Sequence, residues 1–255
     1  MNKVIMLGAG GSTGVPTAIG YWGQCDPSNP KNLRTRASIY LEVDNVKILI
    51  DTSPDLRHQM LRHNINDFDA VLFTHDHADH SHGIDELKSI FQKHDKQRLP
   101  IYGTQATIDS LKARFAYLFS QPDDSPYLSI LEPHVIEGNF KVKDVDVISF
   151  PQIHGHYMIS TGFRFKNFAY STDFSDLTPD AISQLQGLDT WIVDCLSLYT
   201  PPTHQNLAQS LTWIETLKPK RAILTHMGPT LDYQAVSAMI PENVEPGYDG
   251  LTIQF

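Results

Sequence analysis

Between residues 74 and 85 the chain reads THDHADHSHGID, and four side chains that can bind a metal lie within six residues: His75, His77, Asp79 and His80. Neutral imidazole and carboxylate groups are ligands for Zn, Mn, Fe or Ni. Neighbouring imidazoles repel one another when protonated, so a metal explains the cluster better than a pH switch does. The alternative is a solvated histidine-rich loop, but such tracts do not normally lie between a strand and a helix.

The residues around this turn predict the elements that position it. Residues 70–73 are a short apolar run typical of a buried strand, and residues 84–91 predict a helix that extends to about Lys93. Ligands commonly converge where a strand ends and a helix begins in α/β proteins. Further helices are predicted over residues 107–119, 206–217 and 236–240.

Several other predicted strands also end in a polar residue. The later ones, each with the residue that follows it, are 145–150 with His154 and His156, 167–171 with Asp173, 191–193 with Asp194, and 222–224 with His226. An earlier hairpin strand over residues 46–50 ends at Asp51. Asp51 either orients a metal ligand or caps a helix over residues 54–63.

The N-terminal part predicts a first strand over residues 4–7 that runs into the glycine-rich segment GAGGSTGVP, residues 8–16. This segment either lets the backbone approach a ligand or makes a sharp chain reversal. It is not a Walker A loop, because no Gly-Lys-Ser/Thr follows. After a loop over residues 21–32 come Arg34 and Arg36, which either grip a second phosphate of the substrate or are ordinary strand-edge cations.

Composition limits the classes of function. The chain has 255 residues, 41% of them hydrophobic, without repeats or linkers, so we expect one domain over residues 1–255 with a sheet-on-sheet core covered by helices. The formal net charge of −9 argues against extended nucleic acid as a partner. A small anionic substrate stays compatible with it, because metal ions reverse the local field.

Targeting signals are not evident in the sequence. No apolar run approaches the roughly 20 residues that span a bilayer, and residues 1–8 are expected to form a strand rather than a signal peptide. The two cysteines, Cys25 and Cys195, are too few for a disulfide framework. We therefore expect a cytoplasmic protein without membrane partners.

The HxHxDH turn, a later single histidine, an aspartate after a strand and a final histidine after another strand together resemble the metallo-β-lactamase superfamily. The resemblance implies an α/β fold, a four-layer αββα sandwich of two mixed β-sheets flanked by helices, whose loops bind two divalent metal ions (Zn, Mn or Ni). It implies one metal bound by His75, His77 and His154, a second bound by Asp79, His80 and His226, and Asp173 bridging both. His154 is preferred to His156 because it directly follows the strand.

Further motifs are most similar to the phosphoribosyl cyclic phosphodiesterase, or PhnP-like, branch: GAGGSTGVP, DTSPDLR, STDFSD, VDCLS, THQNL and LTHMGP. Proteins of that branch carry an extra histidine where His204 stands. Well-studied members also have a structural zinc held by several cysteines in the N-terminal loop. Here that loop keeps only Cys25, so the sequence predicts that this zinc is absent.

The expected function is a phosphodiesterase that opens a small cyclic phosphodiester, a ribosyl 1,2-cyclic or a nucleotide 2′,3′-cyclic phosphate, with a metal-bridging hydroxide. His204 and Asp79 are the candidate catalytic residues, and His204 would protonate the leaving alkoxide. The alternative for His204 is an exposed residue at a helix start. The expected partner is a small phosphorylated sugar or nucleotide, and the sequence leaves homodimer formation open.

Other functions on this metal site stay open. A glyoxalase II-like thioesterase or a lactonase would share the ligands, and so would a metal-binding protein without turnover. A tRNA 3′-end nuclease would need a basic arm to hold RNA, and none is evident between Gln92 and Lys143. A β-lactamase would usually supply a cysteine ligand, whereas the bridging position here is Asp173.

Overall fold

The computed structural model describes residues 2–120 and 128–255, and its strands form two sheets. The first sheet contains, in spatial order, β15 (Thr252–Gln254), β1 (Lys3–Gly8), β2 (Ser38–Val43), β3 (Val46–Ile50), β4 (Ala70–Leu72), β5 (Leu99–Gly103) and β6 (Leu131–Val135). The second contains β11 (Asp176–Leu177), β8 (Val145–His154), β9 (Met158–Phe165), β10 (Phe168–Ser171), β12 (Thr190–Asp194), β13 (Arg221–Thr225) and β14 (Val244–Pro246), with β7 (Phe140–Val142) paired to β8.

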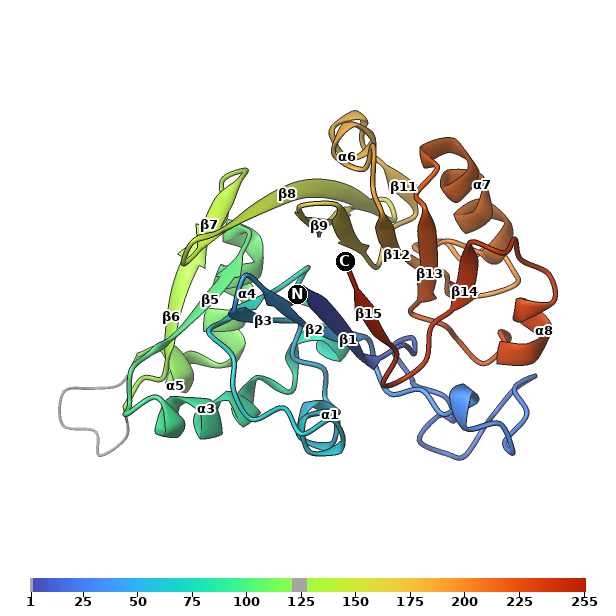
Figure 1. The fold of residues 1–255 in the computed structure, drawn as a ribbon. Coiled ribbons are helices and arrows are strands. Elements are labelled where there is room, and N and C mark those ends of the chain that lie inside the picture. Colours follow the sequence, from blue (N-terminus) through green and yellow to red (C-terminus); the bar gives the residue numbers. More distant parts are fainter. Residues whose placement is uncertain (1, 121–127) are drawn as a thin grey trace.

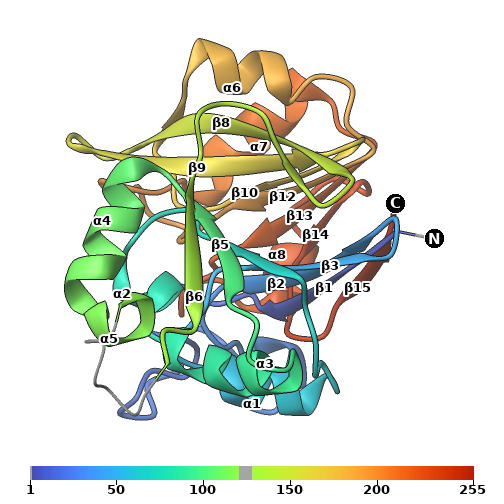
Figure 2. The same ribbon diagram turned by 90° about the vertical axis from the view of Figure 1, so that its left-hand side faces the viewer.

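Helices cover the outer face of each sheet, so that the order of layers is helix, sheet, sheet, helix (Figures 1 and 2). Those packed on the first sheet are α1 (Leu56–Arg62), α3 (Leu87–Lys93), α4 (Gln105–Arg114) and α5 (Ala116–Phe119). Those packed on the second are α6 (Pro179–Gln184), α7 (Leu207–Leu217) and α8 (Tyr233–Ser237). The predicted αββα sandwich is confirmed. Across residues 2–120 and 128–255, the structure contains no helix with the length and apolar character of a membrane span.

The core between the sheets is made of fully buried apolar side chains from both. Ile39, Ile48 and Leu72 of the first sheet belong to one cluster with Phe163 and Ile192 of the second. Both sheets are mixed: β3 to β6 are parallel, and so are β10, β12, β13 and β14. Parallel strands are buried on both faces, which is why β4 and residues 191–193 of β12 are continuous apolar runs in the sequence.

Helix boundaries differ from the sequence prediction. The expected helix at residues 84–93 begins as a 3-10 turn, η2 (Ile84–Glu86), before α3. The helix expected over residues 107–119 starts earlier, because Thr104 caps it, and it breaks at Phe115, whose φ is −125°. The last helix is Tyr233–Ser237 rather than 236–240, because the Asp232 side chain accepts the backbone N–H of Ala235 and begins the helix sooner.

Candidate metal centre

Polar residues at the ends of buried strands meet at one edge of the two-sheet core. Asp51 follows β3, His75 lies just after β4, Asp173 follows β10, Asp194 ends β12, and His226 follows β13. The carboxyl ends of neighbouring parallel strands meet at the same edge of a sheet. The two sheets also contact each other here, since the backbone N–H of Thr161 in β9 donates to the carbonyl of Thr74, just after β4, at 2.8 Å.

The first group of candidate ligands contains His75, His77, His154 and Asp173, with one ligand atom of each lying within 4.8 Å of the others. Nδ1 of His77 is 3.4 Å from Nε2 of His154. His154 ends β8, and its Nδ1 donates to the carbonyl of Thr203 at 2.8 Å, which turns Nε2 towards the group. His156, the alternative to His154, is exposed and lies outside the group.

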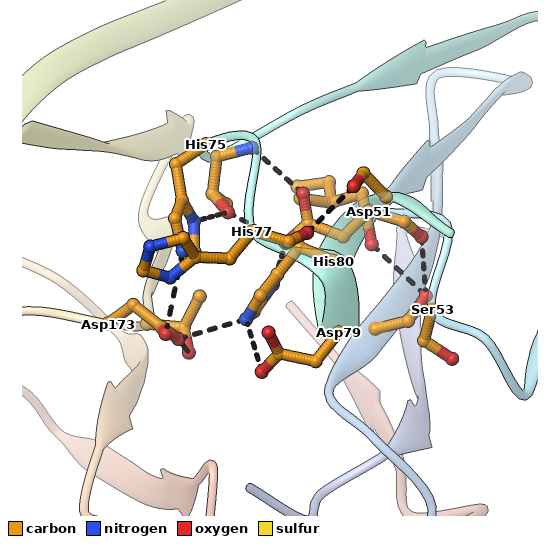
Figure 3. Close-up of polar contacts among 12 residues, drawn as sticks. Asp51, Ser53, His75, His77, Asp79, His80 and Asp173 are labelled. Carbon is orange, nitrogen blue, oxygen red and sulfur yellow. Dashed lines mark hydrogen bonds and ion pairs between the residues drawn. The ribbon is translucent and has the colours of Figure 1, made fainter. Parts of the chain in front are cut away.

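The second group contains Asp79, His80, Asp173 and His226. Nε2 of His80 lies 3.3 Å from Oδ2 of Asp79 and 3.2 Å from Oδ1 of Asp173 (Figure 3). Nε2 of His226 lies 3.3 Å and 3.5 Å from the same two oxygens. Asp79 and His80 both come from the short helix α2 (Ala78–Ser81), so one turn of chain supplies neighbouring ligands.

Asp173 belongs to both groups and lies between them. Its Oδ1 faces His80 and His226, and its Oδ2 is 3.7 Å from Nε2 of His75. Its φ is +55°, and Asp51 and His226 have φ of +64° and +58°. Left-handed backbone is costly for residues other than glycine and is found where function requires a particular direction. Here each of the three residues follows the end of a strand (β3, β10 or β13).

A third group shares Asp173 and His226 and adds Asp194 and His204. Oδ2 of Asp194 accepts the backbone N–H of Gln205 at 2.9 Å and lies 3.4 Å from Nδ1 of His204. The His204 ring stacks on that of His226 with centroids 4.7 Å apart. Only 9% of His204 is exposed, so it is not a solvent-exposed residue at the start of α7.

The sequence predicts for Asp194 only that it ends a strand and belongs to the VDCLS motif. Its Oδ1 also lies 3.8 Å from Nδ1 of His226, so one buried carboxylate contacts two histidines. The available signal was its position, since Asp173 and Asp194 each stand at the carboxyl end of a parallel strand of the same sheet.

Asp51 holds the ring of His80 in place. Its carboxylate is fully buried, accepts the backbone N–H and the hydroxyl of Thr74 at 2.8 Å each, and lies 2.7 Å from Nδ1 of His80. Nε2 of His80 therefore points into the second group. Of the two roles considered for Asp51, the structure supports the orienting one, because the capping position of α1 is Asp55.

The polar atoms of these groups fit divalent metal ions. Nε2 of His75 and Nε2 of His80 are buried, and within the part of the chain that the structure describes neither has a contact with hydrogen-bond geometry, although carboxylate oxygens lie 3.2 to 3.7 Å away. Buried polar atoms are normally hydrogen-bonded, so each such atom needs an explanation. A metal site explains these two nitrogens, because imidazole nitrogens and carboxylate oxygens without thiolate form a donor set suited to Zn, Mn or Ni.

Protons compete with a metal for this site. Burial lowers the pKa of His80, but the carboxylates of Asp173, Asp51 and Asp79 outweigh it and raise that pKa well above its usual value. A protonated His80 must lose its proton to bind a metal. We expect metal binding to release protons and the affinity to fall as pH falls. Calorimetric titration in PIPES and in HEPES at one pH tests this: the measured enthalpies should differ, and equal enthalpies would contradict the prediction.

Replacing Asp51 with asparagine should weaken metal binding about 10- to 100-fold, because His80 loses the carboxylate that orients its ring. Chelator competition on the purified protein measures this affinity. Asp67→Asn is the matched control, since Asp67 makes a similar 2.7 Å contact with His94 outside the three groups. Equal effects of the two substitutions would show that Asp51 has no special connection to the metal.

Arg34 is not available to a substrate. It is 1% exposed, and its guanidinium donates to the carbonyl of Leu231 at 2.8 Å and to Oδ1 of Asn32 at 3.2 Å. The Sγ of Cys25, also buried, lies 3.9 Å away. Arg34 therefore ties the loop of residues 21–32 to the C-terminal part of the chain, and the suggestion that it grips a phosphate is wrong.

Comparison with known proteins places this geometry in a family context. Residues 46–227 match the family model described as a beta-lactamase superfamily domain. The chain is 32% identical over 254 residues to a Porphyromonas gingivalis protein named octanoyltransferase, covering 98% of this chain and 51% of that protein. It is 30% identical over 135 residues to ribonuclease Z of Methanopyrus kandleri, covering 49% of this chain and 48% of that protein. The chain thus spans about half the length of these curated relatives.

Solved structures give a similar result over the whole chain. A diphosphatase of the PhnP family superposes with a TM-score of 0.90 at 32% identity, covering 100% of this chain and 97% of that chain. Zn-bound PqqB from Methylobacterium extorquens (TM-score 0.75, 17% identity, 99% and 100% covered) shares the fold. So does the short form of human tRNase Z (TM-score 0.70, 17% identity, 99% and 98% covered).

Proposed function

Because the chain belongs to the metallo-β-lactamase superfamily and has the fold of its metal-dependent hydrolases, we propose that it hydrolyses a small cyclic phosphodiester. The substrate class is a ribosyl 1,2-cyclic or a nucleotide 2′,3′-cyclic phosphate. The observation that carries the proposal is His204, which is buried beside the candidate ligands with its Nδ1 3.4 Å from Oδ2 of Asp194. Phosphodiester hydrolysis expels an alkoxide, which requires such a proton donor.

Two metal ions are proposed for the centre. His75, His77 and His154 would hold one, Asp79, His80 and His226 the other, and Asp173 both. When bound, such ions polarise phosphoryl oxygens, offset charge that develops on them, and activate a water nucleophile. The residue shared by the two proposed metals, Asp173, supplies a carboxylate rather than a thiolate. A carboxylate is a hard ligand, which suits metals that bind phosphate oxygens.

His204 is proposed as the general acid. Burial opposes the charged imidazolium, but the Asp194 carboxylate outweighs it and raises the pKa of His204 to about 9. Asp194 faces Nδ1 at 3.4 Å, whereas Nε2 is directed to the Asp173 side, 3.9 Å from its Oδ2. At neutral pH the ring can therefore donate its Nε2 proton to a leaving oxygen while Asp194 stabilises the orientation.

A diphosphate is the second candidate substrate. The structure that covers the chain completely at 32% identity is described as a diphosphatase of the PhnP family, which supports reaction at a phosphoric anhydride. Both candidate reactions need in-line displacement at phosphorus and charge neutralisation on its oxygens. They differ in the leaving group, because a phosphate leaves more easily than a sugar alkoxide and needs less help from His204.

Nuclease and acyl-transfer functions have less support. The ribonuclease Z relative aligns over only 135 residues. The sequence predicts no basic arm between Gln92 and Lys143. The described residues of this segment form the end of α3, then α4, α5 and β5 to β7. Residues 121–127 of the segment lie outside the described part. The name octanoyltransferase comes from a protein of which this chain spans about half, so an acyl thioester belongs among the test compounds.

The proposal also places the enzyme in the cytoplasm, acting on a small phosphorylated sugar or nucleotide rather than on extended nucleic acid. Both cysteines are buried and free, as expected for a reducing compartment. The net charge of −9 suits a small substrate recognised at a cationic site better than a long polyanion.

A substrate panel tests the proposal. The protein, reconstituted separately with Mn, Ni and Zn, would be given a nucleoside 2′,3′-cyclic phosphate, a linear diester, a nucleoside diphosphate, a glutathione thioester and a lactone. We expect the cyclic phosphate to have the highest kcat/KM. Faster cleavage of the diphosphate would favour the second candidate, and turnover confined to the thioester or lactone would overturn both.

A further inference from the structure

The glycine-rich segment, residues 8–16, lies against the last candidate metal ligand. The backbone N–H of Gly11 donates to the carbonyl of Met227 at 3.3 Å, and the backbone N–H of Met227 donates to the carbonyl of Ala9 at 2.8 Å. Both polar backbone groups of the residue that follows His226 are therefore held by this segment. Left-handed backbone such as that of His226 persists only where its surroundings fix it, and the segment supplies that restraint.

Gly11 also packs against the side chain of His226. A Cβ on Gly11 would lie 2.8 Å from Cδ1 of Leu196, 3.3 Å from the carbonyl oxygen of His226 and 3.6 Å from its Nδ1. Glycine permits this close approach because it has no side chain. Backbone approach, one of the two roles considered for the segment, is thus directed at a candidate metal ligand.

A single buried carboxylate anchors this segment. Asp249 lies between β14 and β15 and is 7% exposed. Its Oδ1 accepts the backbone N–H of Ala9 at 3.0 Å, and its Oδ2 accepts the backbone N–H of Thr35 at 2.8 Å and the hydroxyl of Thr35 at 2.7 Å. Because the carbonyl of Ala9 accepts from Met227, two hydrogen bonds connect Asp249 to the residue next to His226.

The same carboxylate is connected to the opposite side of the metal centre. The hydroxyl of Thr35 accepts from Nε2 of Gln59 at 2.9 Å, and Oε1 of Gln59 accepts the hydroxyl of Ser53 at 3.0 Å. Ser53 (Figure 3) follows Thr52, whose backbone N–H donates to the carbonyl of His80 at 2.8 Å. A polar chain, largely buried, thus extends from the carboxylate to the backbone of His80.

The contacts of Asp249 require an ionised carboxylate, because all three are made by donors. Burial raises the pKa of Asp249 to about 6, although the hydrogen bonds from Thr35 and Ala9 and the charge of Arg62, 3.7 Å away, act in the opposite direction. The group is therefore ionised at neutral pH. An amide in its place would lose one acceptor and would direct its own N–H groups at a backbone N–H.

We infer that Asp249 is a positioning residue for the second metal, which holds His226 through Ala9 and Met227 and supports His80 through the polar chain. The inference rests on the two-metal arrangement of the proposed function and does not depend on the substrate. Both histidines belong to the second group of candidate ligands. Loss of the carboxylate should therefore weaken the metal of the second group and leave that of the first group in place.

Release of cobalt tests the inference. The wild type and Asp249→Asn, each loaded with two equivalents of Co²⁺, would be titrated with a chelator while the d–d absorption bands are recorded. We expect Asp249→Asn to release one equivalent at an about tenfold lower chelator concentration and the other as the wild type does. Asp69→Asn is the matched control, since Asp69 accepts the backbone N–H of Lys47 at 2.8 Å outside the three groups, and it should release both equivalents as the wild type does.

Gly11→Ala provides a second variant, because its Cβ would press on Leu196 and His226 without removing the carboxylate. We expect it to show the same selective loss, and it decides the question if circular dichroism shows Asp249→Asn to be unfolded. Unchanged release of both equivalents, or an equal loss of both, would overturn the inference. A wild type that binds one equivalent would overturn the two-metal arrangement as well. Two bound equivalents without hydrolysis of any phosphate ester would overturn the proposed function alone.

Discussion

Replacing Asp173 with alanine should lower kcat/KM by more than about 1,000-fold and remove bound metal, the largest effect expected of any single substitution. Asp173 belongs to all three groups of candidate ligands, and its two oxygens face His75, His80 and His226. Without it, neither of the two proposed metals would have a complete ligand set, and the histidines would lose their shared counter-charge. Metal content by mass spectrometry and kcat/KM on the preferred phosphate substrate measure the two losses.

The control for Asp173→Ala is Asp176→Ala, which removes an exposed carboxylate from the same sheet. Circular dichroism should show both variants folded, and Asp173→Asn, which keeps the size of the side chain, provides a second test if alanine destabilises the protein. Full metal content and full activity in both Asp173 variants would exclude Asp173 as the shared ligand.

Replacing His204 with alanine should lower kcat about 100- to 10,000-fold for a sugar alkoxide leaving group, because the general acid is lost. The same variant should retain most activity towards bis(p-nitrophenyl) phosphate, since p-nitrophenolate leaves without a proton. Metal content should stay at the wild-type level. The dependence of the loss on the leaving group distinguishes proton donation from any other contribution of this ring.

His156→Ala is the control for this variant, because His156 is an exposed histidine close to His154 on the β8–β9 hairpin. The third group, in which His204 and Asp194 join Asp173 and His226, also permits a ligand role for His204. Equal losses on both leaving groups, accompanied by loss of metal, would support that ligand role and contradict proton donation.

The sequence predicts the fold well because its signals are local. The apolar run of β4 and the HxHxDH turn are contiguous in the chain, and β12 and β13 are recognisable as buried strands. Strand ends carrying His154, Asp173 and His226 follow from the same patterns. Helix ends are less accurate, because capping by Thr104 and Asp232 is decided by single side-chain contacts.

What the sequence leaves open depends on contacts between distant segments. Arg34 and Arg36 are two residues apart and alike in type, yet Arg34 is buried against Leu231 whereas Arg36 lines a cavity beside Asp79. The dual contact of Asp194 with His204 and His226 has no local signature either. The left-handed backbone at Asp51, Asp173 and His226 cannot be predicted from the sequence either, because none of these residues is a glycine.

The central claim is that the protein hydrolyses phosphate esters only with its metal ions bound. Phosphorus NMR of one sample tests it most directly: chelator-treated protein with a nucleoside 2′,3′-cyclic phosphate, recorded before and after an excess of Zn, which is diamagnetic, is added. We predict that the cyclic resonance persists in the first spectra and is replaced by a monoester resonance in the second. A cyclic resonance that persists after metal is bound, in a protein that cleaves a thioester or lactone under the same conditions, would contradict the account.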